Sequence, residues 1–418
     1  MLERIGQYNE TLNAFITVTA DVALDQARKA DEELCQAKDR GPLHGIPITV
    51  KDLFATKGIR TTCGSMLFEN WIPDQDAAAV TRMFDAGAVL LGKTGLHELA
   101  YGNTSINPFF GPVRNPWASD HDPGGSSGGS AAAVSAGLAY AALGTETGCS
   151  IRQPAHCCGI VGHKPTYGMI SLDGVQALVP SMDHVGPLTR SVEDAALMLS
   201  ALTGTQDFDC LGAAVEGARI GVVRDFFFDG YPDVIEVADA ALDVIRRLGA
   251  DLIDLGLPDI AQASREARIT FLEALAVHAD NLERNPEGFS EELRGRLAES
   301  RDISDERYAQ AQEFRRRFVA ESEDLMKKCD VLVAPTATIA AAPIDDRPED
   351  YRRNAWKNTG ISDLTGQPSV SIPCGFTKKG LPVGLMFTGR LKEDEKVLQI
   401  AHAIQQATDW YRTPPKFP

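Results

Sequence analysis

The most informative stretch of the sequence is Asp122-Pro-Gly-Gly-Ser-Ser-Gly-Gly-Ser130. Runs of glycine and serine are usually flexible linkers. This run, however, leads straight into residues 130–143, which are small and apolar on every side and therefore predict a buried helix. A linker does not join core elements in this way, and a long irregular stretch inside a compact unit is usually functional. We therefore interpret the stretch as a loop that presents Ser126.

Two other reactive side chains stand in similar surroundings. Ser150 lies 24 residues after Ser126, at the end of a second glycine-containing loop, and Lys51 follows the apolar run 46–50. A serine becomes a nucleophile only when a base takes its proton, and a lysine can be that base only when it is neutral. Burial beside glycines and apolar strands favours the neutral amine. Residues 124–130 lack the lysine of a phosphate-binding loop, so that kind of site is not predicted.

The composition is that of a soluble globular protein and argues against a nucleic-acid partner. The chain has 418 residues, of which 44% are hydrophobic and 24% charged, and its net charge is −17. An acidic chain repels phosphate backbones, so we expect no nucleic acid to bind. The basic cluster Arg315-Arg316-Arg317 is interpreted as a solvated helix face.

The sequence also predicts a cytoplasmic location without metal or cofactor. No apolar run approaches the roughly 20 residues of a membrane helix, and the N-terminus is too polar for a signal peptide. The eight cysteines form no CxxC pair. His156-Cys-Cys158 and His163 do not have the spacing of a zinc site. We therefore expect a reduced, cytoplasmic enzyme that contacts no membrane and uses no metal and no cofactor.

The order of elements predicts an α/β fold. Alternating helices and buried strands at the front, a charged helical middle and strands at the back suggest one intertwined domain over residues 1–418, with 213–330 as a variable helical region. Helices are predicted over 9–38, 77–86, 233–248 and much of 262–328, and strands over 46–50, 88–91, 219–223, 331–334, 369–372 and 383–386.

Further motifs surround the three reactive residues. In chain order they include Gly41-Pro-Leu-His-Gly-Ile-Pro-Ile-Thr-Val-Lys51, Gly111-Pro-Val-Arg-Asn-Pro-Trp117, Pro123-Gly-Gly-Ser-Ser-Gly-Gly-Ser130, Gly162-His-Lys-Pro-Thr-Tyr-Gly168, Ser181-Met-Asp-His-Val-Gly-Pro187 and Leu364-Thr-Gly-Gln-Pro368. Over about residues 9–410 the chain resembles the amidase signature family. A lone glycine–serine run would be a weak signal, but several independent motifs in the right order are specific.

The resemblance implies a fold and a mechanism. The fold would be the amidase signature fold, an α/β structure with a large mixed central β-sheet covered by helices on both faces. The family uses a Ser–cis-Ser–Lys triad, which assigns Ser150 as nucleophile, Ser126 as bridging serine after a cis bond from Gly125, and Lys51 as base. The 24-residue spacing between the two serines agrees with the family and selects Ser126 rather than Ser127.

The loop that precedes Ser150 should stabilise the oxyanion of the reaction. Two of its residues depart from the family pattern: Cys149 stands where glycine is usual, and Glu146 where aspartate is usual. We expect Glu146 to pair with Arg152, and a covalent role for Cys149 stays open as an alternative. The backbone N–H groups expected to form the oxyanion hole are those of Thr147, Gly148, Cys149 and Ser150.

The expected activity is hydrolysis of the C–N bond of neutral amides. Aryl amides, carbamates (a urethanase activity) and esters are further candidate substrates, because all pass through the same acyl-enzyme. The expected partner is a small-molecule amide or carbamate, and the chain is a possible homodimer. Tyr101, Gly125 and Phe226 are the predicted substrate-binding residues.

Two alternatives remain open. The chain is alternatively the glutaminase subunit of a tRNA-dependent amidotransferase, which feeds ammonia to a partner. That role needs an arginine and an aspartate to bind the α-groups of glutamine; Asp363 is the candidate acid, and no arginine can be assigned. A non-catalytic binding module is the third interpretation, against which the intact Lys51, Ser126 and Ser150 argue.

Overall fold

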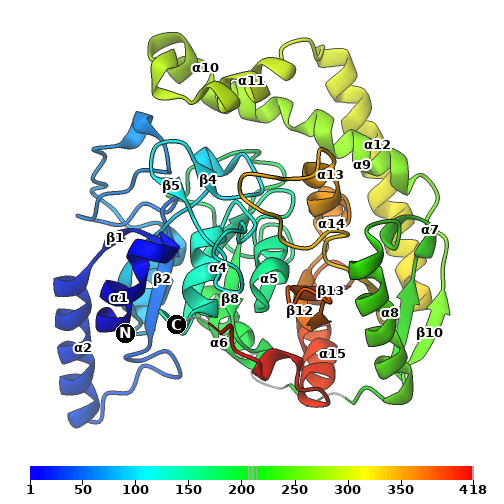
Figure 1. Ribbon diagram of the computed structural model, residues 1–418, viewed down its shortest axis with the longest axis horizontal. Helices are drawn as coiled ribbons and strands as arrows, with labels where there is room; N and C mark the ends of the chain where they lie inside the picture. The colour runs from blue at the N-terminus through cyan, green and yellow to red at the C-terminus, as the bar shows by residue number, and fades with distance from the viewer. Residues whose placement is uncertain (206–207, 209–210, 213, 417–418) are drawn as a thin grey trace.

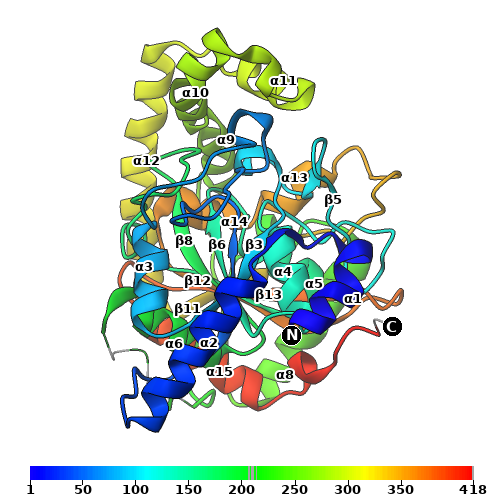
Figure 2. The ribbon, with the colours of Figure 1, turned by 90° about the vertical axis from the view of Figure 1, so that its left-hand side faces the viewer.

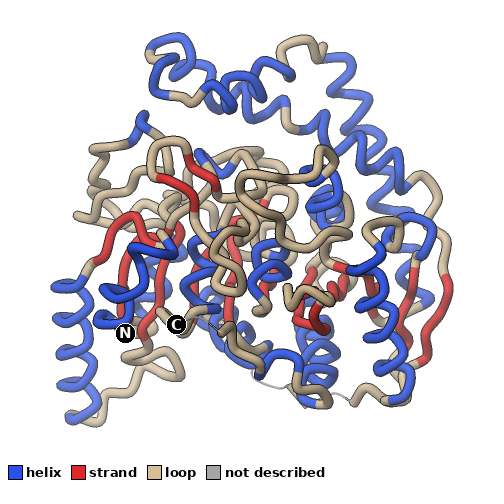
Figure 3. Tube along the Cα trace, viewed as in Figure 1, coloured by secondary structure: helices blue, strands red, loops and turns tan. Residues whose placement is uncertain are grey.

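The computed structural model describes residues 1–205, 208, 211–212 and 214–416, and its centre is a mixed sheet (Figures 1 and 3). Within those residues the sheet has 11 strands in the order β1-β3-β2-β6-β8-β7-β12-β13-β11-β9-β10. Strand β2 is parallel to both of its neighbours, β3 and β6. The next five pairs along the sheet are antiparallel: β6–β8, β8–β7, β7–β12, β12–β13 and β13–β11. The strands are β1 (Phe15–Val18), β2 (Pro47–Lys51), β3 (Val89–Thr94), β6 (Ala141–Glu146), β7 (Val161–Lys164), β8 (His184–Thr189), β9 (Arg219–Val222), β10 (Asp251–Asp254), β11 (Val331–Pro335), β12 (Ser369–Phe376) and β13 (Pro382–Thr388), with β4 (Ile106–Asn107) and β5 (Gly111–Pro112) forming a separate pair.

Helices cover both faces of this sheet, as expected. Successive strand residues point to opposite faces, and β6 shows the result: Ala142 packs in the cluster with α4 and α5, whereas Ala141 and Leu143 pack in the cluster that contains α3, α6, α8 and α15. The helices are α1 (Leu2–Leu12), α2 (Ala20–Cys35), α3 (Ala78–Asp85), α4 (Gly128–Ser135), α5 (Arg152–Cys158), α6 (Val192–Thr203), α7 (Arg224–Phe227), α8 (Pro232–Arg247), α9 (Ile260–Thr270), α10 (Leu272–Arg284), α11 (Glu291–Glu299), α12 (Asp305–Leu325), α13 (Tyr351–Trp356), α14 (Thr359–Thr365) and α15 (Asp394–Gln406).

Helices α9–α12 form a separate helical arm. In Figures 1 and 2 this arm, coloured light green to yellow, extends beyond the layered body on the side where α13 and the β4–β5 pair lie. Its own apolar residues, among them Phe289, Leu293 and Phe314, belong to the same buried cluster as Tyr101 and Trp356 of the body. The arm is therefore packed against the edge where the strands β2 and β6 end.

Two predicted helices are wrong in their extent. The helix predicted over 9–38 is two helices separated by β1, because Asn13 adopts a left-handed conformation (φ 50°) that ends α1, and Phe15 pairs with Thr94 of β3. The buried helix predicted over 130–143 ends at Ser135, and Gly137 (φ 66°) turns the chain into β6. In both places the residues are small or apolar, so they can be buried equally well in a helix and in a strand.

Several of the predicted strands and helices are confirmed. The strands predicted at 46–50, 219–223 and 331–334, and the helices at 77–86 and 233–248, match elements of the structure within two residues. None of the described helices is long and apolar enough to cross a membrane. Seven cysteines are free thiols, and Cys210 lies outside the described residues.

Candidate active site

Lys51 lies at the end of β2, at the centre of the candidate site. Its side chain is fully buried, and its Nζ donates hydrogen bonds to Ser126 Oγ and to Thr145 Oγ1, each at 2.7 Å. Burial lowers the pKa of Lys51 to about 7, although the negative charge of Asp183 opposes the shift. A large fraction of this amine is therefore neutral near neutral pH and able to accept a proton.

Other buried lysines have different partners. Lys93 forms an ion pair with Asp52, Nζ to Oδ1 3.2 Å, and Lys164 donates to the carbonyl of Pro165 at 3.1 Å. Burial lowers the pKa of both amines. A lowered pKa is thus common to several lysines of this core, and what distinguishes Lys51 is its contact with a serine.

The glycine-rich loop places Ser126 against Lys51. The Gly125–Ser126 peptide bond is cis, as the resemblance implies. The N–H of the following Ser127 donates to the carbonyl of Ser150 at 3.2 Å, which ties this loop to the second one. A Cβ on Gly125 would lie 2.6 Å from the backbone nitrogen of Thr104, so only glycine fits there. The fold therefore holds the two serine loops side by side at the end of Lys51.

A buried ion pair fixes the loop that carries Ser150. Glu146, the last residue of β6, accepts hydrogen bonds from the backbone N–H groups of Ile151 (2.9 Å) and Arg152 (3.0 Å). Its side chain also pairs with the Arg152 guanidinium, as predicted, and both side chains are fully buried. Arg152 reaches Asp363 as well, Nη2 to Oδ2 2.8 Å. Residues 147–150 are thus held between the end of β6 and the start of α5.

We expect Arg152→Met to destabilise the protein strongly. Although burial alone would raise the pKa of Glu146, the charge of Arg152 holds it below its usual value. Methionine would leave that carboxylate buried without its cation, and breaking a buried pair costs about 3–5 kcal/mol. Urea denaturation should show this loss in the free energy of unfolding.

The control for this variant is an exposed pair. Arg28 and Asp25 lie 2.7 Å apart with 68% and 77% of their side chains exposed, so Arg28→Met should leave the urea midpoint nearly unchanged. Equal midpoints for Arg152→Met and wild type would contradict the structural role given to the buried pair.

A cavity of about 510 Å³ opens onto the second serine loop. Its lining includes all four predicted oxyanion residues, Thr147, Gly148, Cys149 and Ser150, together with Tyr101, one of the predicted substrate-binding residues. The volume is in the range of small-molecule sites. The arm and the body both contribute to it, since Phe271 of the arm stacks on Tyr101 with ring centroids 5.3 Å apart and Trp356 of α13 lies across Phe271.

Sequence reasoning missed the charged lining of this cavity. Four arginines belong to it, Arg268, Arg296, Arg352 and Arg353. They come from α9, α11 and α13, and no motif in the sequence brings those segments together. Only the fold places them at the same cavity as Ser150.

Three residues predicted to contact a ligand lie outside the cavity lining. Phe226 does not line the cavity; it packs on Phe227 with ring centroids 5.5 Å apart, and Lys357 Nζ lies 5.3 Å from its ring. Asp363, the candidate acid for glutamine, is fully buried against Arg152 and is not part of the lining either. Gly125 precedes Ser126 without lining the cavity, and its N–H donates to Gln153 Oε1 at 2.8 Å.

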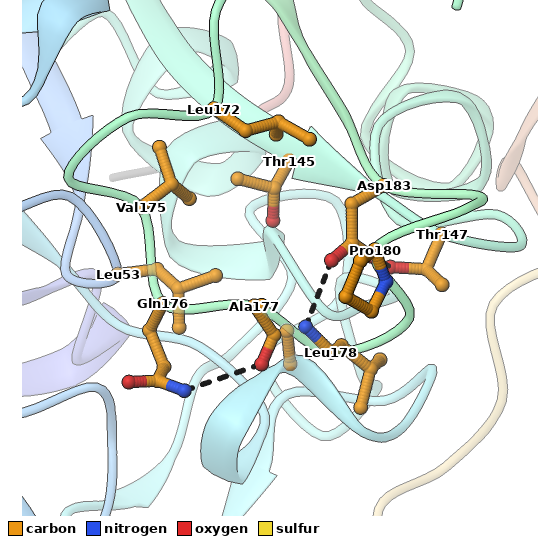
Figure 4. A pocket seen from close by; sticks show the side chains of 11 residues that line it. Leu53, Thr145, Thr147, Leu172, Val175, Gln176, Ala177, Leu178, Pro180 and Asp183 are labelled. Atoms are coloured by element: carbon orange, nitrogen blue, oxygen red, sulfur yellow. Dashed lines mark hydrogen bonds between the residues drawn. The ribbon is translucent and has the colours of Figure 1, made fainter. Parts of the chain in front are cut away.

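A second, smaller cavity of about 110 Å³ has Thr145, Thr147 and Asp183 in its lining (Figure 4). It shares Ala100, Thr147 and Leu178 with the larger cavity, and Thr145, which accepts a hydrogen bond from Lys51, lines it as well. Thr147 Oγ1 donates to Asp183 at 2.6 Å, and Figure 4 shows the same carboxylate accepting from the backbone N–H of Leu178. Thr145 therefore places this cavity next to the amine of Lys51.

Cys149 is a poor nucleophile in this setting. Burial, and then the charge of Glu146, raises the pKa of the Cys149 thiol above its usual range. Its Sγ lies 3.6 Å from the carbonyl oxygen of Gly125. Because the thiolate is the reactive form of cysteine, this environment argues against a covalent role.

Comparisons with known proteins identify the family of this chain. The model of the Amidase family matches residues 1–398. A glutamyl-tRNA(Gln) amidotransferase subunit of Methylobacillus flagellatus is 38% identical, over 99% of this chain and 94% of that protein. A crystal structure described as an amidase has 35% identity and a TM-score of 0.90, covering 97% of this chain and 94% of its own. The corresponding amidotransferase subunit from Thermotoga maritima has 33% identity and a TM-score of 0.84, covering 100% and 93%. With its mixed sheet flanked by helices, and with this match along most of its length, the chain belongs to the amidase family.

Proposed function

We propose that this protein hydrolyses amide bonds through an acyl-enzyme on Ser150. The observation that carries the proposal is the 2.7 Å contact between the buried amine of Lys51 and Ser126 Oγ. In this mechanism Lys51 takes a proton through Ser126 from Ser150, whose oxygen bonds to the acyl carbon. Proton transfer by a positioned base of this kind contributes roughly 10²- to 10⁴-fold.

The remaining steps use groups of the same loops. The carbonyl oxygen becomes negative and is stabilised by the N–H groups of residues 147–150. The C–N bond then breaks, and the leaving amine receives the proton back through Ser126. Water finally adds to the acyl carbon and releases the acid; the small cavity beside Lys51 offers room for that water.

Residues 213–330 are proposed to shape the substrate pocket within one domain over 1–418. Two facts support this. Strands β9 and β10 extend the same sheet as β1 and β2, and α9 and α11 contribute Arg268 and Arg296 to the cavity.

The proposal has two versions, a glutaminase subunit and a free-standing amidase, which differ in their physiological substrate. The curated relatives favour the glutaminase alternative over a free-standing amidase, since they are glutamyl-tRNA(Gln) amidotransferase subunits that match this chain over nearly its whole length. In that role the chain would release ammonia from glutamine for a complex that acts on tRNA, and the expectation of no nucleic-acid partner would hold only for the isolated chain. Carbamates are an additional proposed substrate class, and their cleavage, a urethanase activity, would use the same serine nucleophile.

Ammonia release from glutamine separates the two roles. The purified chain should be assayed alone and after co-expression with the amidotransferase partners of its host, beside a panel of neutral anilides and carbamates. Glutamine turnover that appears only with the partners supports the amidotransferase role, and turnover of the panel by the chain alone supports the free amidase. Failure of every substrate in both settings would reject the proposed function.

A further inference from the structure

The arginines of the large cavity form a positive site in an acidic protein. Four of them line it, against two carboxylates, those of Glu299 and Glu349. The chain as a whole carries a net charge of −17. A local excess of positive charge in such a chain attracts an anion into the cavity.

Among the described residues, only Arg296 of these four arginines has a carboxylate partner. Arg296 pairs with Glu292 and donates to the carbonyl of Tyr101. In the part of the chain that the structure describes, no carboxylate lies within 4.0 Å of Arg268, Arg352 or Arg353. Burial and the charges of Arg352 and Arg353 lower the pKa of Arg268. These three guanidinium groups therefore repel one another and would be stabilised by a bound anion.

An aromatic wall lies between these arginines and the serine loop. Tyr101 and Phe271 are stacked, Trp356 lies edge-on to Phe271, and the guanidinium of Arg268 sits 5.4 Å from the centre of the Trp356 ring. Gly148 packs against the same ring, since a Cβ there would lie 3.3 Å from Trp356 Cε3. The wall thus runs from the oxyanion loop towards the arginines, and flat apolar groups pack well on such surfaces.

We propose that the cavity binds amides whose acyl part carries a carboxylate beyond a flat apolar segment, with Arg268, Arg352 and Arg353 as the anion-binding residues. Guanidinium groups bind carboxylates through paired, charge-assisted hydrogen bonds. This inference rests on the proposed function for the position of the amide at Ser150. Glutamine offers the carboxylate without the flat segment and is therefore a weaker ligand of this site.

The test compares 4-carbamoylbenzoate with its neutral analogue 4-methylbenzamide and with glutamine. We expect kcat/KM to be highest for 4-carbamoylbenzoate. The double substitution Arg352→Gln and Arg353→Gln should lower that value about 10- to 100-fold, the size expected for lost charge-assisted hydrogen bonds, and should lower the value for 4-methylbenzamide far less. Arg316→Gln, which removes an exposed arginine of α12 paired with Glu313, is the matched control and should change neither value.

Binding separates this inference from the proposed function. Calorimetry with the Ser150→Ala protein measures the affinity of the cavity for 4-carbamoylbenzoate, whether or not the wild type turns this compound over. Binding that weakens with the two arginine substitutions and with added salt supports the inference even if no amide is hydrolysed. Equal affinity for 4-carbamoylbenzoate and 4-methylbenzamide, or tighter binding of glutamine than of both, would overturn it and leave the serine chemistry untouched.

Discussion

Ser150→Ala should abolish amide hydrolysis while leaving the fold intact. Loss of a nucleophilic serine in a hydrolase that uses an acyl-enzyme lowers kcat by roughly 10⁴- to 10⁶-fold. The loop should keep its shape, because the contact that ties Ser150 to the other serine loop is made by its backbone carbonyl, which accepts from Ser127 at 3.2 Å. The measurements are kcat on a chromogenic anilide and covalent labelling by a fluorophosphonate, both of which should disappear.

A second buried serine provides the control for this loss. Ser135, in α4, donates its hydroxyl to the carbonyl of Cys158 at 2.7 Å and does not line the cavity. Ser135→Ala should cost about 1 kcal/mol of stability, as a lost hydrogen bond does, and should keep turnover and labelling. Retention of full turnover by Ser150→Ala would show that the nucleophile has been assigned to the wrong residue.

The fold could be predicted from the sequence where periodicity and breakers agree. Strand β2 is predictable because an apolar run ends at a lysine, and α8 because its apolar spacing begins at a proline. The segment around Phe15 has the apolar spacing of a helix. Its strand partner, β3, is nearly 80 residues away, so no local sequence pattern indicates that the two segments pair. Strand β6 is hidden in an alanine-rich run, whose small residues fit a buried helix and a buried strand alike.

The candidate site, too, could be predicted only where its residues lie in local sequence motifs. Lys51, Ser126 and Ser150 could be proposed because they sit in motifs that are local in sequence, and the structure brings Lys51 and Ser126 into contact. The predicted pairing of Glu146 with Arg152 is confirmed, since the two residues are close in sequence. The walls of the cavity come from helices dispersed over 268–356, so neither the arginines nor the displacement of Phe226 could be derived from spacing.

Lys51→Met should remove the base without removing the fold. We expect kcat/KM to fall roughly 10²- to 10⁴-fold, the contribution of a general base. In the wild type, kcat/KM should also fall about tenfold per pH unit below pH 7, because Lys51, whose pKa is about 7, becomes protonated there. The variant should lack this dependence. Lys378→Met, which changes a lysine with 85% of its side chain exposed, should keep both the rate and the pH profile.

Lys51→Met should gain stability while it loses activity. The pKa of Lys51 is about 7 in the folded protein and near the ordinary lysine value of 10.5 in the unfolded chain, so the unfolded state binds more protons between these values. Wild-type stability therefore rises with pH from about 7 to 10.5, and below that window the full cost of burying this amine is present. Methionine removes that cost, so the stability of Lys51→Met relative to wild type should be greatest below about pH 7 and should shrink as the pH rises towards 10.5. A constant difference in Tm across the window, or a pH–rate profile that the substitution leaves unchanged, would mean that the amine stays charged, and a charged amine cannot take the proton of a serine.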